Sequence, residues 1–125
     1  QYVQAISEHV ARALDGRESS EDALLFTAHN VPEETILGGD PYVDEIQHTI
    51  AQLLPAIMPG DWRLGWQSKG RRGDARWLEP EVEYVVLQFA AQGWQKLLVV
   101  PVGFLCDNVE TLYDLDVVLR ERQRR

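Results

Sequence analysis

The sequence predicts a three-layer α/β/α sandwich built on a parallel sheet, in a single domain that spans residues 1–125. Three observations lead to this prediction. Short apolar runs alternate along the chain with longer segments in which apolar residues recur at helical spacing. The short runs are apolar throughout, as is typical of strands buried on both faces of a sheet. The length of 125 residues suits one core of ordinary size.

Helical spacing predicts two helices in the first half of the chain. The first covers 2–14, where Asp15-Gly16 ends it, and the second covers 42–57, where Pro59-Gly60 ends it. Between them, a polar loop leads into a continuous apolar run over 23–28, which predicts a buried strand. That strand stops at His29, and a turn-rich segment with the sequence Gly-Asp-Pro-Tyr follows.

The second half continues the alternation. A short strand over 62–66 leads into a loop over 67–80 that is rich in glycine and arginine. A helix over 81–92 follows, with Pro80 near its first turn and Gly93 beyond its end. The run KLLVVPV predicts a strand over 96–102, and Asp107 or Asn108 provides the N-cap of a final helix over 107–124.

Composition and charge argue against several classes of protein. The net charge of −8 and the pI near 4.8 disfavour a nucleic-acid partner, which requires a basic surface. No apolar run reaches the length of a membrane span, and no segment has the pattern of a signal peptide. Cys106 is the only cysteine, so we expect no internal disulfide and a cytoplasmic location. A peripheral contact with a membrane is compatible with these properties.

Ligands of parallel α/β sheets bind beyond the carboxyl ends of the strands, and three loops leave such ends here. His29 begins the first loop, and its imidazole could serve as a base or as a metal ligand. A histidine that hydrogen-bonds its own loop is the more common role for an isolated residue of this kind. The other two loops cover 67–80 and 103–108.

Carboxylates share one face of the expected final helix. Glu110 and Asp114 lie four residues apart, and Asp107 precedes Glu110 by three. Such a row could bind a divalent metal ion or relay protons, whereas a solvated acidic face near a helix N-terminus is the simpler interpretation. This helix is expected to start directly after the strand over 96–102. Its first turn would then face the ligand crevice beyond the strand ends, which favours a functional role for the carboxylates.

Aromatic, polar and basic residues lie in or beside the second loop. They are Trp66, Gln67, Ser68, Arg71, Arg72 and Trp77. A tryptophan at a crevice can stack on a flat ligand, although a core position is the more common role for Trp66. The arginines could bind the carboxylates of an acidic ligand. Residue types and spacing alone thus predict an α/β domain with a histidine and a row of carboxylates near one crevice.

Three segments resemble the ferrochelatase family, in the family's order and at plausible spacing. LLFTAHNVPEETILGGDPY is similar to an apolar strand followed by Ser-Ala-His-Gly/Ser-Leu-Pro and Gly-Asp-Pro-Tyr. RLGWQSKG and WLEPEVE resemble the Trp-Gln-Ser…Trp-Leu-Gly-Pro segment, and LLVVPVGFLCDNVETLYDLD resembles the segment that contains Asp-His-x-Glu-x-Leu-Tyr. The resemblance covers about residues 20–117.

The resemblance implies a chelatase-like, Rossmann-like half-domain that matches the C-terminal half of a ferrochelatase. Ferrochelatases are lyases that insert ferrous iron into a porphyrin in heme biosynthesis. His29 and Glu110 fall on the catalytic histidine and glutamate, and Asp114 joins them as a metal ligand on the next member of an acidic row. Trp66, Gln67, Ser68, Arg71, Arg72 and Trp77 are the substrate-binding candidates.

The same resemblance implies the partners. Ferrous iron is a substrate, so no tightly bound cofactor is expected. The porphyrin lies between two α/β halves in this family, so we expect either a missing N-terminal half or a second copy of the chain as partner. An isolated half could be inactive.

Several residues depart from the family pattern. Asn30 stands where glycine or serine is usual, Asn108 replaces a histidine, and Val118 replaces an acidic residue. The forms GWQSKG and VPVGF are closer to the Gram-positive type, which uses coproporphyrin III rather than protoporphyrin IX. Two alternatives stay open: a short homodimeric tetrapyrrole chelatase for cobalt or nickel, and a tetrapyrrole-binding module without catalysis.

Overall fold

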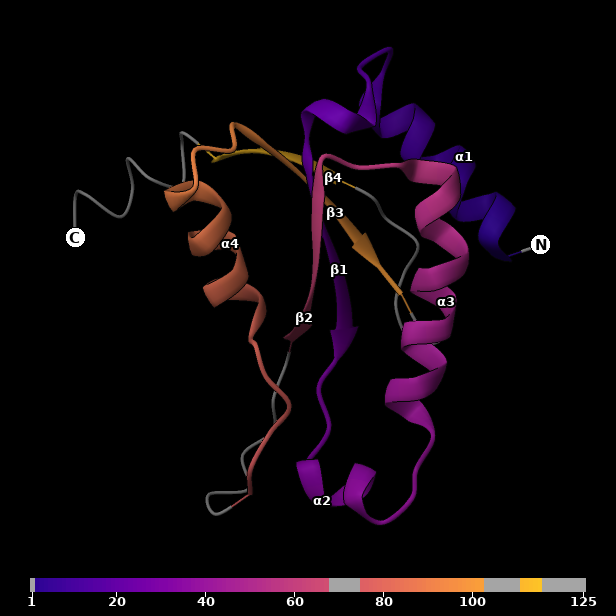
Figure 1. Cartoon of the computed structure of the whole chain (residues 1–125), viewed down its shortest axis with the longest axis vertical. Coiled ribbons are helices and arrows are strands. Elements are labelled where there is room, and N and C mark those ends of the chain that lie inside the picture. Colours follow the sequence, from indigo (N-terminus) through magenta and orange to yellow (C-terminus); the bar gives the residue numbers. More distant parts are fainter. Residues whose placement is uncertain (1, 68–74, 103–110, 116–125) are drawn as a thin grey trace.

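The computed structural model describes residues 2–67, 75–102 and 111–115, and four strands in this part of the chain form one sheet in the order β2-β1-β3-β4 (Figure 1). The elements, in chain order, are α1 (Tyr2–Leu14), a short 3-10 helix η1 (Ser19–Glu21), β1 (Ala23–His29), α2 (Glu33–Leu37), α3 (Tyr42–Ile57), β2 (Asp61–Gln67), α4 (Val82–Ala91), β3 (Lys96–Pro101) and β4 (Thr111–Asp114). The three predicted helices and three predicted strands before residue 103 are all present. The short helix α2 was not predicted.

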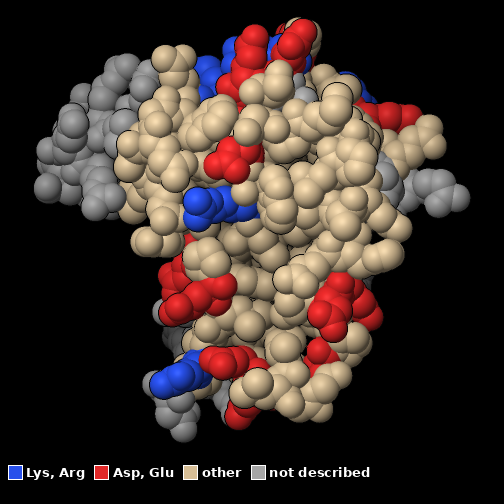
Figure 2. Space-filling view, in the orientation of Figure 1, with Lys and Arg blue, Asp and Glu red and all other residues tan. Residues whose placement is uncertain are grey.

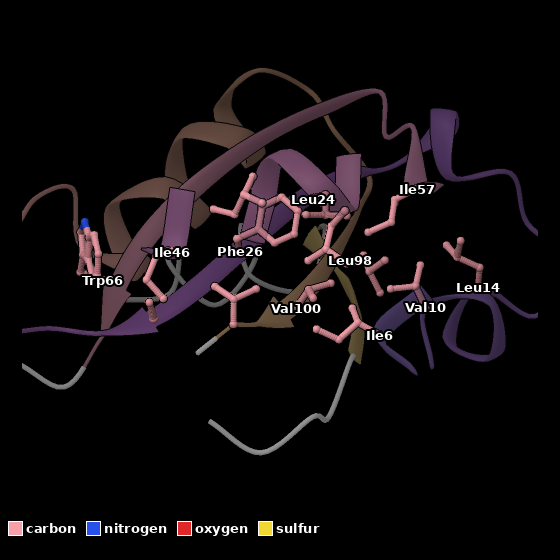
Figure 3. Close-up of a cluster of buried hydrophobic side chains, with 14 residues drawn as sticks. Ile6, Val10, Leu14, Leu24, Phe26, Ile46, Ile57, Trp66, Leu98 and Val100 are labelled. Carbon is pink, nitrogen blue, oxygen red and sulfur yellow. The ribbon is translucent and has the colours of Figure 1, made fainter. Parts of the chain in front are cut away.

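Helices cover both faces of the sheet, which confirms the three-layer prediction (Figure 1). On one face, apolar residues of α1 and α3 pack against Leu24, Phe26 and Val100 (Figure 3). On the other face, Val85 and Phe89 of α4 pack against residues that include Leu25. Side chains alternate between the faces of a strand, so β1 contributes to both clusters and is apolar from Ala23 to Phe26.

The three strands β2, β1 and β3 are parallel, so their carboxyl ends meet at one edge of the sheet. The register pairs Ala23 with Asp61 of β2 and with Leu97 of β3. At the other end of β1, His29 lies opposite Gln67. The carboxyl ends of β1 and β2 therefore lie side by side.

The prediction of a helix over 107–124 is wrong at Thr111–Asp114, where the structure has the strand β4. This strand pairs antiparallel with β3, and its register places Asp114 opposite Lys96. The backbone N–H of Leu115 also donates to the carbonyl of Gln95 over 2.8 Å. Hydrogen bonds to the free edge of β3 thus outweigh the helical spacing of the sequence, and aromatic residues such as Tyr113 are well suited to strands. Residues 107–110 and 116–124 of the predicted helix lie outside the described residues.

The amino end of the sheet is closed by polar contacts. Asp22 is buried, and its carboxylate accepts a hydrogen bond from the Arg17 guanidinium over 2.6 Å. The carbonyl of Asp22 accepts from the N–H of Gly60 over 3.0 Å. Among the described residues, no helix is both long enough and apolar enough to cross a membrane.

Candidate active site at the carboxyl ends of the strands

His29 is the last residue of β1, and its side chain is exposed. Leu25 packs in the cluster on the α4 face, and every second residue of a strand points the same way, so the His29 side chain lies on that face too. Gln67 is its register partner on β2 and points to the same side. No described residue hydrogen-bonds the His29 imidazole, so its ring nitrogens are available to a ligand.

Tyr42 fixes the backbone on which His29 sits. Its hydroxyl donates a hydrogen bond to the His29 carbonyl oxygen over 2.9 Å. The N–H of Tyr42 donates in turn to the Asp40 carboxylate over 2.9 Å, and this bond holds the first turn of α3. Sequence reasoning missed Tyr42 as a site residue, although the Gly-Asp-Pro-Tyr turn was the signal that could have identified it.

Trp66 and Gln67 differ in their surroundings, although both are substrate-binding candidates. Trp66 is only 5% exposed and belongs to the core cluster, where its ring lies 6.0 Å from the ring of Tyr42. It can therefore influence the site through Tyr42. Gln67 is half-buried at the end of β2, and its carbonyl accepts a hydrogen bond from the N–H of Asn30 over 2.8 Å.

Trp77 lies on a segment that runs beside the loop after β1. Pro32 and Trp77 form an antiparallel bridge, and the N–H of Glu33 donates to the carbonyl of Arg76 over 2.7 Å. The buried side chain of Asn30 also bonds to Leu78. The structure thus brings Trp77 to the end of β1, as the sequence predicted for the loops at this edge.

A groove of about 640 Å³ lies between α2 and this segment. Its walls are Glu33, Ile36 and Leu37 on one side and Ala75, Arg76, Trp77, Leu78, Glu79 and Glu81 on the other. Three carboxylates and one guanidinium lie among its apolar side chains, and Figure 2 shows charged side chains on both sides of the lower end of the molecule, where α2 lies. His29 is not among the residues that line this groove, so the groove is not a binding pocket for a ligand of the histidine.

The structure does not bring Asp114 to His29. Asp114 forms a salt bridge with Lys96 over 3.1 Å at the first residue of β3, whereas His29 ends the parallel strand β1. The two residues are separated by most of the strand length, on the order of 20 Å. The prediction that they share a metal site is therefore not supported by this arrangement.

Four other predicted site residues lie outside the described residues: Ser68, Arg71, Arg72 and Glu110. Within the described ranges, no group of three or more histidine, cysteine, aspartate or glutamate residues is placed to hold a metal ion. Of the predicted metal ligands, His29 is the one that the described residues place at this edge.

A mostly parallel, three-layer α/β fold with a histidine at the end of one strand is consistent with a chelatase-like half-domain. The family model described as Ferrochelatase matches residues 1–125, and the chain belongs to the ferrochelatase family.

Curated relatives agree with this assignment. A ferrochelatase from a Geobacter species is 38% identical over 124 residues, which cover 98% of this chain and 38% of the relative. A Synechococcus ferrochelatase is 38% identical over 128 residues, covering 100% of this chain and 37% of the relative. The ferrochelatase of Herpetosiphon aurantiacus is 39% identical over 94 residues, which cover 75% of this chain and 30% of the relative. The chain thus spans less than two fifths of the length of each of these relatives.

Proposed function

We propose that this chain supplies the His29 side of an active site that inserts ferrous iron into a porphyrin in heme biosynthesis. The observation that carries the proposal is the exposed imidazole of His29 at the carboxyl edge of the sheet, which no described residue hydrogen-bonds, in a chain that belongs to the ferrochelatase family. Iron is the substrate in this reaction. The single cysteine is compatible with a reducing cytoplasm, where we place the reaction.

The reaction exchanges two protons for one metal ion. Two pyrrole N–H protons leave the porphyrin as Fe²⁺ enters, and the four ring nitrogens replace the water ligands of the ion. A base beside the ring accelerates this step, and we assign this role to His29, with Glu110 as the second proton acceptor. Imidazole nitrogen and carboxylate oxygen are also suitable ligands for Fe²⁺ during delivery.

The surroundings of His29 favour a fixed imidazole position. The Tyr42 hydroxyl holds its carbonyl, and the register with β2 holds Gln67 beside it. A rigid edge of this kind can bind a bent porphyrin more tightly than a flat one, which directs the pyrrole nitrogens to the metal. Trp77 supplies an aromatic surface for the macrocycle, and Gln67 and Ser68 supply polar contacts.

Arg71 and Arg72 are proposed to choose between porphyrins. Coproporphyrin III carries four propionates and protoporphyrin IX carries two, so a guanidinium pair should favour the first. Replacing both arginines with glutamine should weaken coproporphyrin III binding more than protoporphyrin IX binding. Equal losses for the two porphyrins would contradict this assignment.

The decisive experiment is anaerobic metallation of each porphyrin with Fe²⁺ or Zn²⁺, followed by the loss of free-porphyrin fluorescence. His29→Ala should abolish insertion. His48→Ala is the matched control, because His48 is also an exposed histidine but lies on α3 and interacts with Gln52. Activity that survives His29→Ala, or that falls equally in both variants, would overturn the proposed role of His29.

The experiment should use both the 125-residue chain and the longest natural polypeptide that contains it. The relatives are more than twice as long, so we propose that a second α/β half, or a second copy of the chain, completes the porphyrin site. If the chain alone inserts the metal, and its specific activity falls on dilution, the active form is a homodimer. Porphyrin binding without insertion, unaffected by His29→Ala, would indicate a tetrapyrrole-binding module, and insertion of only Co²⁺ or Ni²⁺ would indicate the short chelatase.

A further inference from the structure

Asn30 carries a buried carboxamide whose oxygen and nitrogen both bond to one distant residue. The residue is 2% exposed. Its Oδ1 accepts a hydrogen bond from the Leu78 N–H over 2.9 Å, and its Nδ2 donates to the Leu78 carbonyl over 3.0 Å. Both polar groups of the side chain therefore pair with both polar groups of one peptide segment, 48 residues further along the chain.

Asn30 also joins the ends of two strands. Its backbone N–H donates to the carbonyl of Gln67 over 2.8 Å, at the end of β2. Two positions later, Pro32 forms the bridge to Trp77 but has no N–H to donate. The carboxamide of Asn30 supplies an additional donor and acceptor beside this proline, and so acts as a peptide group would in a strand ladder.

We propose that Asn30 is a positioning residue: its carboxamide fixes the segment that carries Trp77 relative to His29, and thereby sets the binding surface for the tetrapyrrole. The identity of this ligand rests on the proposed function. A flat macrocycle gains affinity from an aromatic wall that is already in place, because no ordering of that wall is then required on binding. The same bonds hold the segment at a fixed distance from α2, across the groove.

The geometry predicts which side chains can replace Asn30. Aspartate has the same shape, but its second oxygen would face the Leu78 carbonyl, so one bond becomes a repulsion between two acceptors. Alanine leaves the N–H and carbonyl of Leu78 buried without these partners. Serine, which is usual at this position in the family pattern, is too short to reproduce the two-bond pairing seen here.

The first test measures the segment directly by amide hydrogen exchange in the natural polypeptide. The Leu78 amide should be protected in the wild type, and Asn30→Asp and Asn30→Ala should increase its exchange about tenfold or more. The control is Val10→Ala, a core truncation in α1. Figure 3 shows Val10 and Trp66 at opposite ends of the core cluster, so the control lowers stability far from the site. Rapid exchange of Leu78 in the wild type, or equal acceleration in the control, would overturn the proposal.

The second test asks whether Asn30 acts through Trp77. Binding of metal-free protoporphyrin IX and coproporphyrin III should weaken about tenfold in Asn30→Ala and Asn30→Asp, and should be unchanged in Val10→Ala. In a Trp77→Ala background, Asn30→Ala should cause no further loss, because the wall that it positions is gone. Independent losses that add in the double variant would show a general structural role and overturn the proposal.

The two proposals fail in different ways. If the wild type binds neither porphyrin, the proposed function fails, while the exchange measurement still decides whether Asn30 holds the segment. If the wild type binds porphyrin and the Asn30 variants bind it equally well, the proposed function stands and the positioning role is wrong.

Discussion

The Tyr42 hydroxyl donates a hydrogen bond to the His29 carbonyl oxygen over 2.9 Å, across 13 residues of sequence. The bond connects the first residue of α3 to the last residue of β1. Asp40 holds Tyr42 in this position by accepting its N–H. The fixed spacing between the strand-ending histidine and the Gly-Asp-Pro-Tyr turn therefore has a physical reason: the turn returns the tyrosine to the backbone of the histidine.

Removal of this hydroxyl should weaken both the fold and the site. Tyr42→Phe keeps the ring contact with Trp66 but leaves the His29 carbonyl without its partner. We expect the free energy of unfolding to fall by about 1 kcal/mol. The metallation rate should fall as well, because His29 loses part of its orientation. Denaturant unfolding and metallation kinetics measure the two effects.

Tyr84→Phe is the matched control for this change. Tyr84 is 58% exposed on α4, and its hydroxyl accepts a hydrogen bond from Gln88 over 3.1 Å. Both bonds are exposed, but the Tyr84 bond joins two side chains one turn apart on the same helix, whereas the Tyr42 bond joins α3 to the end of β1. We therefore expect a change of no more than about 0.5 kcal/mol and an unaltered metallation rate for Tyr84→Phe. Equal effects of the two substitutions would show that the link between Tyr42 and His29 is unimportant.

Gly65 allows α4 to begin close to β2. A Cβ at this position would lie 3.0 Å from the Cα of Val82 and 3.2 Å from a methyl group of Leu25. Gly65→Ala should therefore force the start of α4 away from the sheet, at a cost of about 1–3 kcal/mol. Gly16→Ala is the comparison for backbone strain without a steric clash. A Cβ at Gly16 would meet nothing within 4 Å, and only the φ of +88° is unfavourable there. A Gly65→Ala variant as stable as the wild type would contradict this packing.

Phe89 anchors α4 to the sheet. It is fully buried in the cluster that contains Leu25 and Leu97, so Phe89→Ala should lower the free energy of unfolding by about 3–5 kcal/mol. Leu37→Ala provides the comparison, since Leu37 is 79% exposed and should change stability by less than about 0.5 kcal/mol. Thermal or denaturant unfolding checks both values. A small effect at Phe89 would show that α4 is not packed as described.

Asp114 provides a test of strand β4. It pairs with Lys96 and is 44% exposed in its side chain, so Asp114→Asn should alter stability by about 1 kcal/mol or less. Because the pair lies at the amino end of β3, Zn²⁺ binding at His29 should be unchanged, whereas His29→Ala should weaken it. Titration with Zn²⁺ measures both variants. Loss of metal binding in Asp114→Asn would support the helical arrangement of this segment instead.

The local patterns predicted most of the secondary structure. The helices over 2–14 and 42–57 begin and end as predicted, because their boundaries depend on apolar spacing and on the glycine and proline residues beside them. The strand over 23–28 extends by only one residue, to His29. Position at a strand end made His29 a candidate, and the short motif around it, which is also local in sequence, gave it the predicted role.

Contacts between distant segments could not be predicted in this way. Helical spacing favoured a helix at Thr111–Asp114, but the free edge of β3, formed by residues about fifteen positions earlier, pairs with this segment as a strand. The Asn30 carboxamide gave no local signal, because its partner is Leu78. The predicted place of Asp114 near His29 depended on the wrongly predicted helix. In the strand β4, Asp114 pairs with Lys96 instead.

The sequence by itself determined the layers, the strand that ends at His29 and the family resemblance, because apolar periodicity, turn residues and short motifs are properties of neighbouring residues. Only the tertiary structure decided that Tyr42 holds the His29 carbonyl, that Asn30 holds the Trp77 segment and that β4 completes the sheet. The physical reason is that a hydrogen bond depends on atoms within about 3 Å, and the fold alone brings such atoms together from distant parts of a chain.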